Sequence, residues 1–433
     1  MTPLTIGLIG LGILFVLLLS RMPIGLVMAL VGFAGFAYIC GFDDALGVLG
    51  TVPYDTFVSY GMSIIPLFIL MGSFCYFAGL SRDLYDTVHA WLGRFRGGLA
   101  MATVGACASF AAVSGSSLAT AATMGTVALP EMRRYKYDDR LATGSVAAGG
   151  TIGILIPPSI VLILYAVITE QSIGKLFLAG FIPGVLEAVF YMVTIYILCK
   201  RNPLMGPPGP RTSFIEKIAS LKKSWVVVVL FVVIIGGIYQ GWFSPIEAAG
   251  VGAFGAFVFA IARRKLSWQV FKESLFETGK TTAMIFVIIM GAMILGYFLA
   301  VSRLPFELAN FIGGLPVNRY VILAIILVFY LALGCVMDSL AMMLLTVPIF
   351  FPLILALDFN TIWFGILVVR VCEMGLITPP VGLNVYIIRG VAKDVSMPTI
   401  FRGIIPFLMA DICHVALLVA VPQVSLFLPG FMK

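Results

Sequence analysis

Long runs of apolar residues, separated by short polar loops, cover nearly the whole chain. Most of them reach the length of about 20 residues that a helix needs to cross the hydrocarbon core of a bilayer. The pattern therefore predicts an all-α, polytopic membrane protein. The runs lie near residues 4–19, 23–40, 61–80, 99–129, 142–169, 176–199, 224–241, 245–262, 281–301, 320–356, 361–388 and 403–422.

The first half of these runs repeats in the second half with a shift close to 222 residues. Motifs that keep this spacing are Pro23-Ile24 with Pro245-Ile246, Ser117-Leu-Ala119 with Ser339-Leu-Ala341, and Pro157-Pro158 with Pro379-Pro380. An ordered series of matches along a chain is typical of an internal duplication. We predict a first repeat at 1–199, a cytoplasmic linker at 200–223 and a second repeat at 224–433.

Two runs in each half predict departures from a simple membrane-spanning helix. The fourth runs, at about 99–130 and 320–356, contain small or polar residues near their middle and predict helical hairpins that enter and leave on one side. The fifth runs, at about 142–169 and 361–388, each contain a Pro-Pro pair, which removes backbone donors and breaks a helix. Pro379 suits the first position of the helix that resumes after the second break.

Composition and cysteine usage agree with a membrane protein and exclude several other classes. The chain is 61% hydrophobic and 11% charged, with a mean hydropathy of +1.10, whereas soluble domains are roughly 25% charged. The first run lacks a basic residue ahead of it and predicts a retained helix rather than a signal peptide. The seven cysteines are scattered and predict neither a disulfide framework nor a metal site. The net charge of +7 lies in a few loops and bears on membrane orientation rather than on nucleic acid.

The basic residues predict how the chain crosses the membrane. If the hairpins do not cross and the other five runs of each half do, nearly all Lys and Arg, including Arg21 and those of the linker, fall on one side. Such a bias marks the cytoplasmic side. An odd number of crossings inverts the second repeat relative to the first and places both termini in the periplasm. The opposite side holds only Lys175, Arg303, Arg319 and Lys433.

A short amphipathic stretch precedes each hairpin. Its apolar residues follow the spacing of one helical face, which predicts a helix lying in the membrane interface and capable of acting as a lever arm. The two stripes are Leu84, Val88, Trp91, Leu92 and Phe95, and Leu304, Leu308, Phe311, Ile312 and Leu315.

The hairpin tips and helix breaks are the candidate ion sites. Both are expected at mid-membrane depth, where unwound carbonyls together with Ser, Thr or Asp oxygens suit Na⁺. We predict that Ser114, Ser116 and Ser117 at the first tip join Gly153 in one sodium site. The second would combine Asp338 and Ser339 with Gly375 and Thr378. For Asp338 the sequence leaves two roles open, binding a cation and capping the tip. For an isolated serine simple packing would be favoured, but clustering beside a helix break favours function.

A substrate site is expected next to these ions. Helix N-termini that resume at Pro158 and Pro380 would favour a carboxylate through their dipoles and free amides. Asn384, which stands where the first repeat has Leu162, would read an asymmetric ligand. Thr120, near the first tip, is the fourth candidate contact.

Five charged or titratable residues in total lie inside apolar runs near the ends of the two repeats. Arg370 and Glu373 are one turn apart, which favours a local ion pair over substrate binding. Glu187, Asp411 and His414 occur at corresponding depths in the last helix of each half, and His414 is interpreted as a packing residue rather than a proton relay.

These motifs resemble those of the large membrane subunit of tripartite ATP-independent periplasmic (TRAP) transporters. The resemblance spans essentially the whole chain and rests on Glu373-Met-Gly-Leu-Ile-Thr-Pro-Pro-Val-Gly-Leu-Asn384, Met337-Asp338, Ser114-Gly-Ser-Ser117 and Ile156-Pro-Pro-Ser159. It implies an elevator-type secondary transporter of the ion transporter superfamily in the bacterial inner membrane, with a scaffold and a mobile core, Na⁺ as coupling ion and a small carboxylate such as a dicarboxylate or sialic acid as substrate. It also implies two partners, a small four-helix membrane subunit and a periplasmic substrate-binding protein.

Three other functions remain open from the residues. A self-sufficient sodium/dicarboxylate symporter would share the architecture without needing partners. An intramembrane hydrolase is disfavoured because neither histidine accompanies the serines of 114–117 in a plausible triad. A channel is disfavoured because the candidate sites lie on hairpins that can occlude. The scarcity of basic residues on the outer side predicts weak steering of a free anion and favours delivery by a binding protein.

Overall fold

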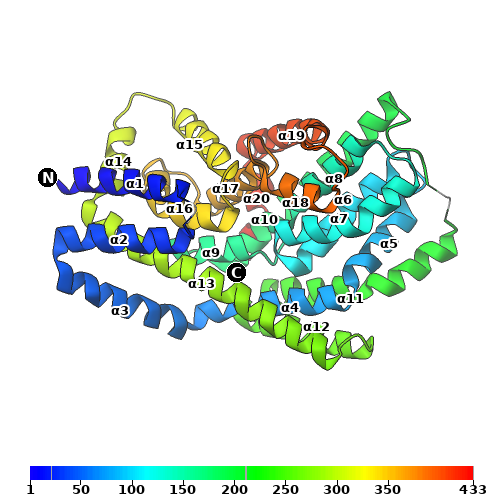
Figure 1. The fold of residues 1–433 in the computed structure, drawn as a ribbon, viewed down its shortest axis with the longest axis horizontal. Helices are drawn as coiled ribbons and strands as arrows, with labels where there is room; N and C mark the ends of the chain where they lie inside the picture. Colours follow the sequence, from blue (N-terminus) through cyan, green and yellow to red (C-terminus); the bar gives the residue numbers. More distant parts are fainter. Residues whose placement is uncertain (21, 210–211, 433) are drawn as a thin grey trace.

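The computed structural model describes residues 1–20, 22–209 and 212–432, and within these ranges every regular element is a helix. The prediction of an all-helical protein is confirmed (Figure 1). Arg21, Arg211 and Lys433, which entered the charge argument, lie outside the described residues. Helices of the first half are α1 (Pro3–Leu19), α2 (Ile24–Cys40), α3 (Phe42–Val58), α4 (Ile64–Phe77), α5 (Leu80–Leu92), α6 (Gly98–Ser114), α7 (Ser117–Arg134), α8 (Asp139–Thr151), α9 (Ile160–Thr169) and α10 (Ile173–Arg201).

The second half contains a corresponding series. Its members are α11 (Phe214–Tyr239), α12 (Pro245–Ala262), α13 (Trp268–Ser302), α14 (Leu304–Gly313), α15 (Arg319–Gly334), α16 (Ser339–Ala356), α17 (Thr361–Gly375), α18 (Leu383–Val391), α19 (Met397–Ala420) and α20 (Gln423–Leu426). Three short 3-10 turns, η1 (Tyr60–Ser63), η2 (Ile152–Ile154) and η3 (Pro429–Phe431), complete the described elements.

Helices from opposite halves pair closely in an outer group. Helix α2 packs along α13, and α4 packs along α12, in the lower part of Figure 1. The α2–α13 contact depends on small residues, because a Cβ added to Gly32 would stand 2.6 Å from the backbone nitrogen of Leu295. Backbones can approach this closely only where one partner lacks a side chain. We call α1–α4 and α11–α13 the frame.

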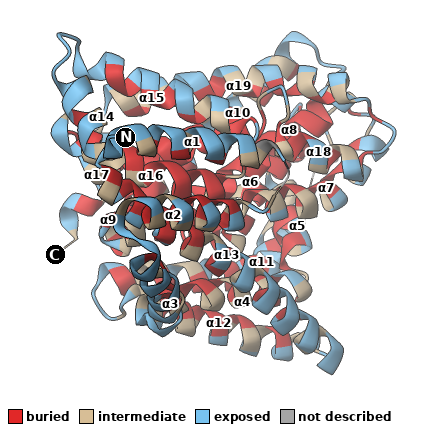
Figure 2. Ribbon diagram, turned by 60° about the vertical axis from the view of Figure 1, so that its left-hand side comes forward, coloured by how far each residue is buried: buried red, intermediate tan, exposed pale blue. Residues whose placement is uncertain are grey.

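The hairpins and broken helices form a second group, which we call the core. Helices α6 and α7 pack on α8, and α15 and α16 pack on α17. The halves also interlock, since α7 contacts α18 and α16 contacts α9. Buried residues concentrate in α6, α8 and α16, whereas α3, α12 and α15 carry much of the exposed surface (Figure 2).

Length and composition identify seven helices that could cross a membrane in the described part of the chain. They are Tyr60–Phe77, Ile173–Arg201, Phe214–Tyr239, Pro245–Ala262, Trp268–Ser302, Ser339–Ala356 and Met397–Ala420. Further apolar helices are shorter, among them α2, α6 and α15. The inverted orientation of the two repeats and the sides of the termini stay predictions.

One helix and two boundaries differ from the sequence-based expectation. Helix α3 was not predicted, because its acidic first turn and Pro53 interrupt the apolar pattern. The linker is shorter than 200–223, since α11 already begins at Phe214, where Ser213 and Glu216 form a capping box. Pro379 does not open the helix after the second break, because α18 starts only at Leu383.

The two amphipathic stretches are helices, as the spacing predicts. Helix α5 buries Leu84 and leaves Trp91 39% exposed, and α14 leaves Phe311 70% exposed. Helix α5 packs against α11 of the frame on one side and α6 of the core on the other. Arg263, at the end of α12, also forms an ion pair with Asp83 of α5. These contacts place α5 where it joins the two groups.

Candidate functional site

The first hairpin tip is a tight turn between α6 and α7. Gly115 has a φ of +58°, a left-handed conformation that glycine adopts without strain. Ser116 caps α7, because its hydroxyl accepts a hydrogen bond from the Ala119 amide at 3.4 Å. A Cβ on Gly115 would lie 2.9 Å from the carbonyl oxygen of Pro158. The tip therefore contacts the first helix break, as predicted.

Hydroxyl groups of the first tip converge on the same place. Ser114 Oγ and Thr120 Oγ1 are 2.9 Å apart, and Thr120 donates to the carbonyl of Ser116 at 2.7 Å. Gly153 lies against them, since an added Cβ would be 3.3 Å from both the Ser116 carbonyl and Thr120 Oγ1. The structure thus brings together Ser114, Ser116, Thr120 and Gly153, a set of oxygens suited to a hard cation.

The second tip has a different chemistry. Asp338 caps α16, because its Oδ1 accepts from the amides of Leu340 and Ala341 at 3.0 and 3.2 Å. Of the two roles that the sequence left open, the structure shows the cap. Gly334 packs directly on Gly375, whose added Cβ would be 2.5 Å from the Gly334 Cα.

Thr378 lies in the loop after α17 and turns its hydroxyl to the carbonyl of Met374, at 2.7 Å. The second group of predicted sodium ligands is therefore close to one helix break, with its side-chain oxygens engaged in protein contacts.

Glu373 connects the two tips. Its Oε1 accepts a hydrogen bond from Ser339 Oγ at 2.5 Å, and the Ser117 hydroxyl lies next to the same carboxyl group. Ser117 and Ser339 are the first residues of α7 and α16, so two helix N-termini point toward this buried acid. Such termini stabilise negative charge. The sequence did not reveal this role, although the position of Glu373 six residues before the Pro379-Pro380 pair was a usable signal.

The predicted ion pair between Arg370 and Glu373 is wrong. Arg370 instead pairs with Glu187 of α10 and Asp411 of α19, and the Glu187 Oε1 is 3.1 Å from Arg370 Nη1. Although the two residues are one turn apart on α17, Arg370 extends toward the last helices of the two halves and Glu373 toward the hairpin tips. Sequence spacing alone does not reveal such long-range partners.

The two Pro-Pro segments share one geometry but differ in environment. Both Pro157-Pro158 and Pro379-Pro380 have cis peptide bonds. The first pair is buried and is followed by Ser159, which caps α9, whereas the second pair is exposed. Neither Pro158 nor Pro380 begins a helix, so the expectation that these prolines mark half-helix N-termini needs correction. The helices begin two and three residues later, respectively, at Ile160 and Leu383.

Asn384 lies at the N-terminal end of α18 and is 0% exposed. Its backbone amide donates to the Leu376 carbonyl at 3.0 Å, and its Nδ2 donates to the Ala147 carbonyl of α8 at 3.3 Å. Its Oδ1 has no hydrogen-bond partner among the described residues. Asn384 therefore ties the second break to the broken helix of the first half and keeps one acceptor unused.

A cavity of about 540 Å³ borders the first tip. Ser114 and Ser116 of the first tip line it together with Glu277 and Thr281 of α13, so the cavity lies between core and frame. Cavities of this size hold small organic molecules. Asn384 and Pro380 are not among its lining residues. Thr120 and Pro158 do not line it either, so none of the four predicted substrate residues borders this cavity in the present conformation. Thr120, Pro158 and Asn384 are buried, and Pro380 is exposed.

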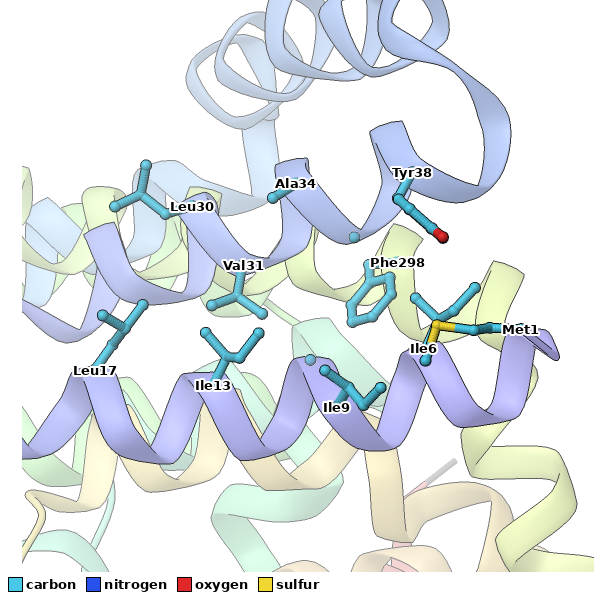
Figure 3. Close-up of a pocket in the computed structure, with 12 residues that line it drawn as sticks. Met1, Ile6, Ile9, Ile13, Leu17, Leu30, Val31, Ala34, Tyr38 and Phe298 are labelled. Carbon is cyan, nitrogen blue, oxygen red and sulfur yellow. The ribbon is translucent and has the colours of Figure 1, made fainter.

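A second cavity, of about 510 Å³, has another character. It lies between α1 and α2, and Figure 3 shows Phe298 of α13 reaching into it between the two helices. Its lining is almost wholly apolar and includes none of the predicted ion or substrate residues. Such a lining suits a hydrocarbon chain or an apolar side chain and not an organic anion.

Comparison with known proteins gives one consistent result. Residues 11–424 match the family described as "Tripartite ATP-independent periplasmic transporter, DctM component". The C4-dicarboxylate TRAP transporter large permease protein DctM of Pseudomonas aeruginosa is 39% identical, over 90% of this chain and 91% of that protein. The sialic acid TRAP transporter large permease protein SiaM of Vibrio cholerae is 34% identical, over 95% and 96%. The isethionate TRAP transporter permease protein DctMQ of Oleidesulfovibrio alaskensis is 33% identical, over 88% of this chain and 60% of that protein.

Solved structures resemble the fold at much lower sequence identity. The YdaH transporter of Alcanivorax borkumensis superposes with a TM-score of 0.61 at 13% identity, covering 87% of this chain and 88% of that one. MtrF of Neisseria gonorrhoeae gives 0.53 at 15% identity, covering 90% and 83%. At this level of identity the likeness concerns architecture alone.

Proposed function

The chain belongs to the DctM family of tripartite ATP-independent periplasmic transporters, and we propose that it imports a small organic anion with sodium as the coupling ion. The family consists of transporter permeases, which excludes the hydrolase alternative. The observation that carries the proposal is the meeting of two hairpin tips and two helix breaks at Glu373, Gly153 and Gly375. Broken helices at such a meeting point are typical of transporter binding sites.

The substrate class follows from the chemistry that the relatives share. Their names specify C4-dicarboxylates, sialic acid, isethionate and 2,3-diketo-L-gulonate, and all of these are small organic anions. In this chain, free amides at the start of α9 and α18 would bind the anionic group. The unused Oδ1 of Asn384 would accept a hydrogen bond from a substrate hydroxyl or amide.

Two sodium sites are proposed, one for each half. The first combines Ser114, Ser116 and Ser117 with the backbone near Gly153. The second combines Asp338 and Ser339 with the segment from Gly375 to Thr378. Support for the first is the pair of hydrogen bonds that links Ser114, Thr120 and the Ser116 carbonyl at 2.9 and 2.7 Å. Gly153 lies beside them, since a Cβ added to it would be 3.3 Å from the Ser116 carbonyl oxygen. Because Ser117 and Ser339 also adjoin Glu373, cations at both sites would be held near one acidic group.

Transport is proposed to proceed by movement of the core against the frame. The cavity beside Ser116 lies between these two groups, which would give the substrate a way out on one side of the membrane. That side carries the N-terminal part of α13, with Lys272 and Lys280, and is cytoplasmic by the positive-inside rule. Helices α5 and α14 would act as levers that follow the core while anchored in the interface.

Two partners are proposed, a small four-helix membrane subunit and a periplasmic substrate-binding protein. The family name describes a tripartite system, and the DctMQ name supports a membrane partner that is fused in that relative. The protein would lie in the bacterial inner membrane with both termini in the periplasm. The exposed apolar faces of α1–α3, including Leu8, Phe42 and Phe57, offer the small subunit a surface to cover.

Reconstitution tests this proposal. Liposomes containing this chain would receive an inward sodium gradient, with a potassium gradient as the matched control, and then the small subunit and the binding protein in turn. We expect uptake of a labelled organic acid only with all three proteins and sodium. Robust uptake by this chain alone would contradict the tripartite proposal and favour a self-sufficient symporter. Equal uptake with sodium and potassium would contradict sodium coupling.

A further inference from the structure

A second group of charged residues lies where α17 of the core packs against α10 and α19, and it is not used by the proposed transport site. Arg370, in the middle of α17, is 0% exposed, as are Glu187 on α10 and Asp411 and His414 on α19. Arg370 forms ion pairs with both carboxylates. Its Nε donates to Nδ1 of His414 at 3.1 Å. We call these four residues the Arg370 cluster.

Two neutral hydroxyls complete the surroundings of the cluster. Thr151, at the end of α8, lies 3.1 Å from Glu187 Oε1, and Tyr191 OH lies 3.4 Å from Arg370 Nη2. The ring of Phe190 packs on His414, and the ring of Phe407 packs on Tyr191. The cluster thus joins α8, α10, α17 and α19 in an apolar environment.

The charges of the cluster do not balance. Because Nδ1 of His414 accepts a hydrogen bond from the arginine, the imidazole is neutral. Arg370 therefore supplies the single positive charge, against two carboxyl groups. The next titratable groups on α17 are Cys372 and Glu373, and Glu373 adds a further acid rather than a cation. Other charged residues of the four helices lie toward helix ends: Asp139, Arg140, Lys175, Lys200, Arg201 and Arg402.

An excess negative charge is costly in this environment. An uncompensated buried ion is strongly disfavoured even after the protein relaxes around it. One oxygen of each acid, Glu187 Oε2 and Asp411 Oδ2, has no hydrogen-bond partner among the described residues although its residue is fully buried. In such an apolar site the protonated form of a carboxyl group has a lower free energy than the charged form.

We propose that the Arg370 cluster is a proton-binding site, in which Glu187 and Asp411 together hold one proton. The remaining carboxylate then balances Arg370, and the whole group is neutral. A sodium ion is a poorer occupant, because the guanidinium in contact with both acids would repel it. With the proton bound, the cluster carries no net charge. Displacing its helices across the membrane would then move no charge of the cluster through the membrane potential. The assignment of the proton does not depend on the proposed substrate or sodium sites.

Infrared spectroscopy of the full chain in lipid bilayers tests this proposal directly. A protonated carboxyl group gives a carbonyl stretching band that a carboxylate lacks, and the band shifts in D₂O. We expect wild-type protein to show one such band that disappears in Glu187→Gln and equally in Asp411→Asn. Either neutral amide removes the need for the proton, because the other acid alone balances Arg370.

Glu373→Gln is the matched control, since Glu373 is also a fully buried acid but lies outside the cluster. The band assigned to the cluster should persist in this variant. The proposal would be overturned if no band disappeared in both cluster variants, or if Glu187 and Asp411 each gave a band of its own. Gln and Asn have the shape of a protonated acid, so failure of both single variants to fold would overturn it as well.

Discussion

At the first hairpin tip Ser114 and Ser116 border a cavity of about 540 Å³, whereas at the second tip Ser339 is bonded to Glu373 and is 3% exposed. The helix breaks differ in the opposite sense. Pro157-Pro158, next to the open tip, is buried, and Pro379-Pro380, next to the closed tip, is exposed. Related helices thus occupy unlike environments in the two halves.

This difference shows how two similar halves can play unlike parts in one transporter. If both halves had identical surroundings, a bound ligand would be equally accessible from both sides of the membrane. Here one tip faces a cavity between frame and core while the other is held by Gly334 against Gly375. A single site that opens to one side at a time requires such an asymmetry. Substitutions at the open tip, at the closed tip and at the residues that join them can test this asymmetry.

The largest effect is expected at the closed tip, from Gly375→Val. The added side chain would meet the backbone of Gly334 at 2.5 Å from its first carbon, and overpacking of this kind costs about 3 kcal/mol. Misplacing a binding group by about 1 Å can lower a rate about a hundredfold, so we expect uptake to fall by about that factor. Gly390→Val is the control, since nothing lies within 4 Å of a Cβ there. Equal uptake by the two variants would contradict the close packing of the tip.

Asn384→Ala tests the residue that joins the second break to α8. We expect the apparent KM to rise by an amount equal to about 1–3 kcal/mol if a buried hydrogen bond to substrate is lost. Because Nδ2 also binds the Ala147 carbonyl, the melting temperature must be measured beside the KM. A lower melting temperature with an unchanged KM would restrict Asn384 to a structural role.

Thr120→Val perturbs the open tip. It removes the hydroxyl that contacts both Ser114 and the Ser116 carbonyl, and one hydrogen bond contributes about 1 kcal/mol. We expect the sodium concentration for half-maximal uptake to rise about fivefold. Thr126→Val, on the exposed face of the same helix, should leave it unchanged. The same shift in both variants would mean that the first tip holds no sodium.

The smallest effect is expected at the surface, from Asp394→Asn. Asp394 lies in the loop after α18 and pairs with Arg133 of α7 at 2.6 Å, which holds the pKa of Asp394 below its usual value. A carboxylate with a lowered pKa stabilises the fold at neutral pH, and this contribution is lost as the pH falls through that pKa. We expect a slightly lower melting temperature than wild type at neutral pH and low salt, and no difference in acid or high salt. A difference that persists in acid would contradict the ion pair.

Local signals predicted the fold of the core. The hairpins and breaks follow from small residues at Gly115 and Gly334 and from the Pro-Pro pairs, which act on the backbone at their own positions. Helix α3 escaped because Asp43, Asp44 and Pro53 obscure its pattern.

The long-range contacts could not be predicted in the same way. Arg370 finds Glu187 and Asp411 through packing of α17 against α10 and α19, and sequence spacing carries no information on that packing. Two acids and a histidine at matching depth in apolar helices, together with a single arginine, were the only signal for the cluster.

The most direct test of the asymmetry between the tips is cysteine labelling from either side of the membrane. Ser116→Cys and Ser339→Cys would be compared in a protein whose exposed Cys40 and Cys413 are replaced by serine. The account predicts that a membrane-impermeant thiol reagent modifies Ser116→Cys from the cytoplasmic side and leaves Ser339→Cys unmodified from both sides. Equal labelling of the two positions, or labelling of Ser116→Cys only from the periplasm, would contradict it.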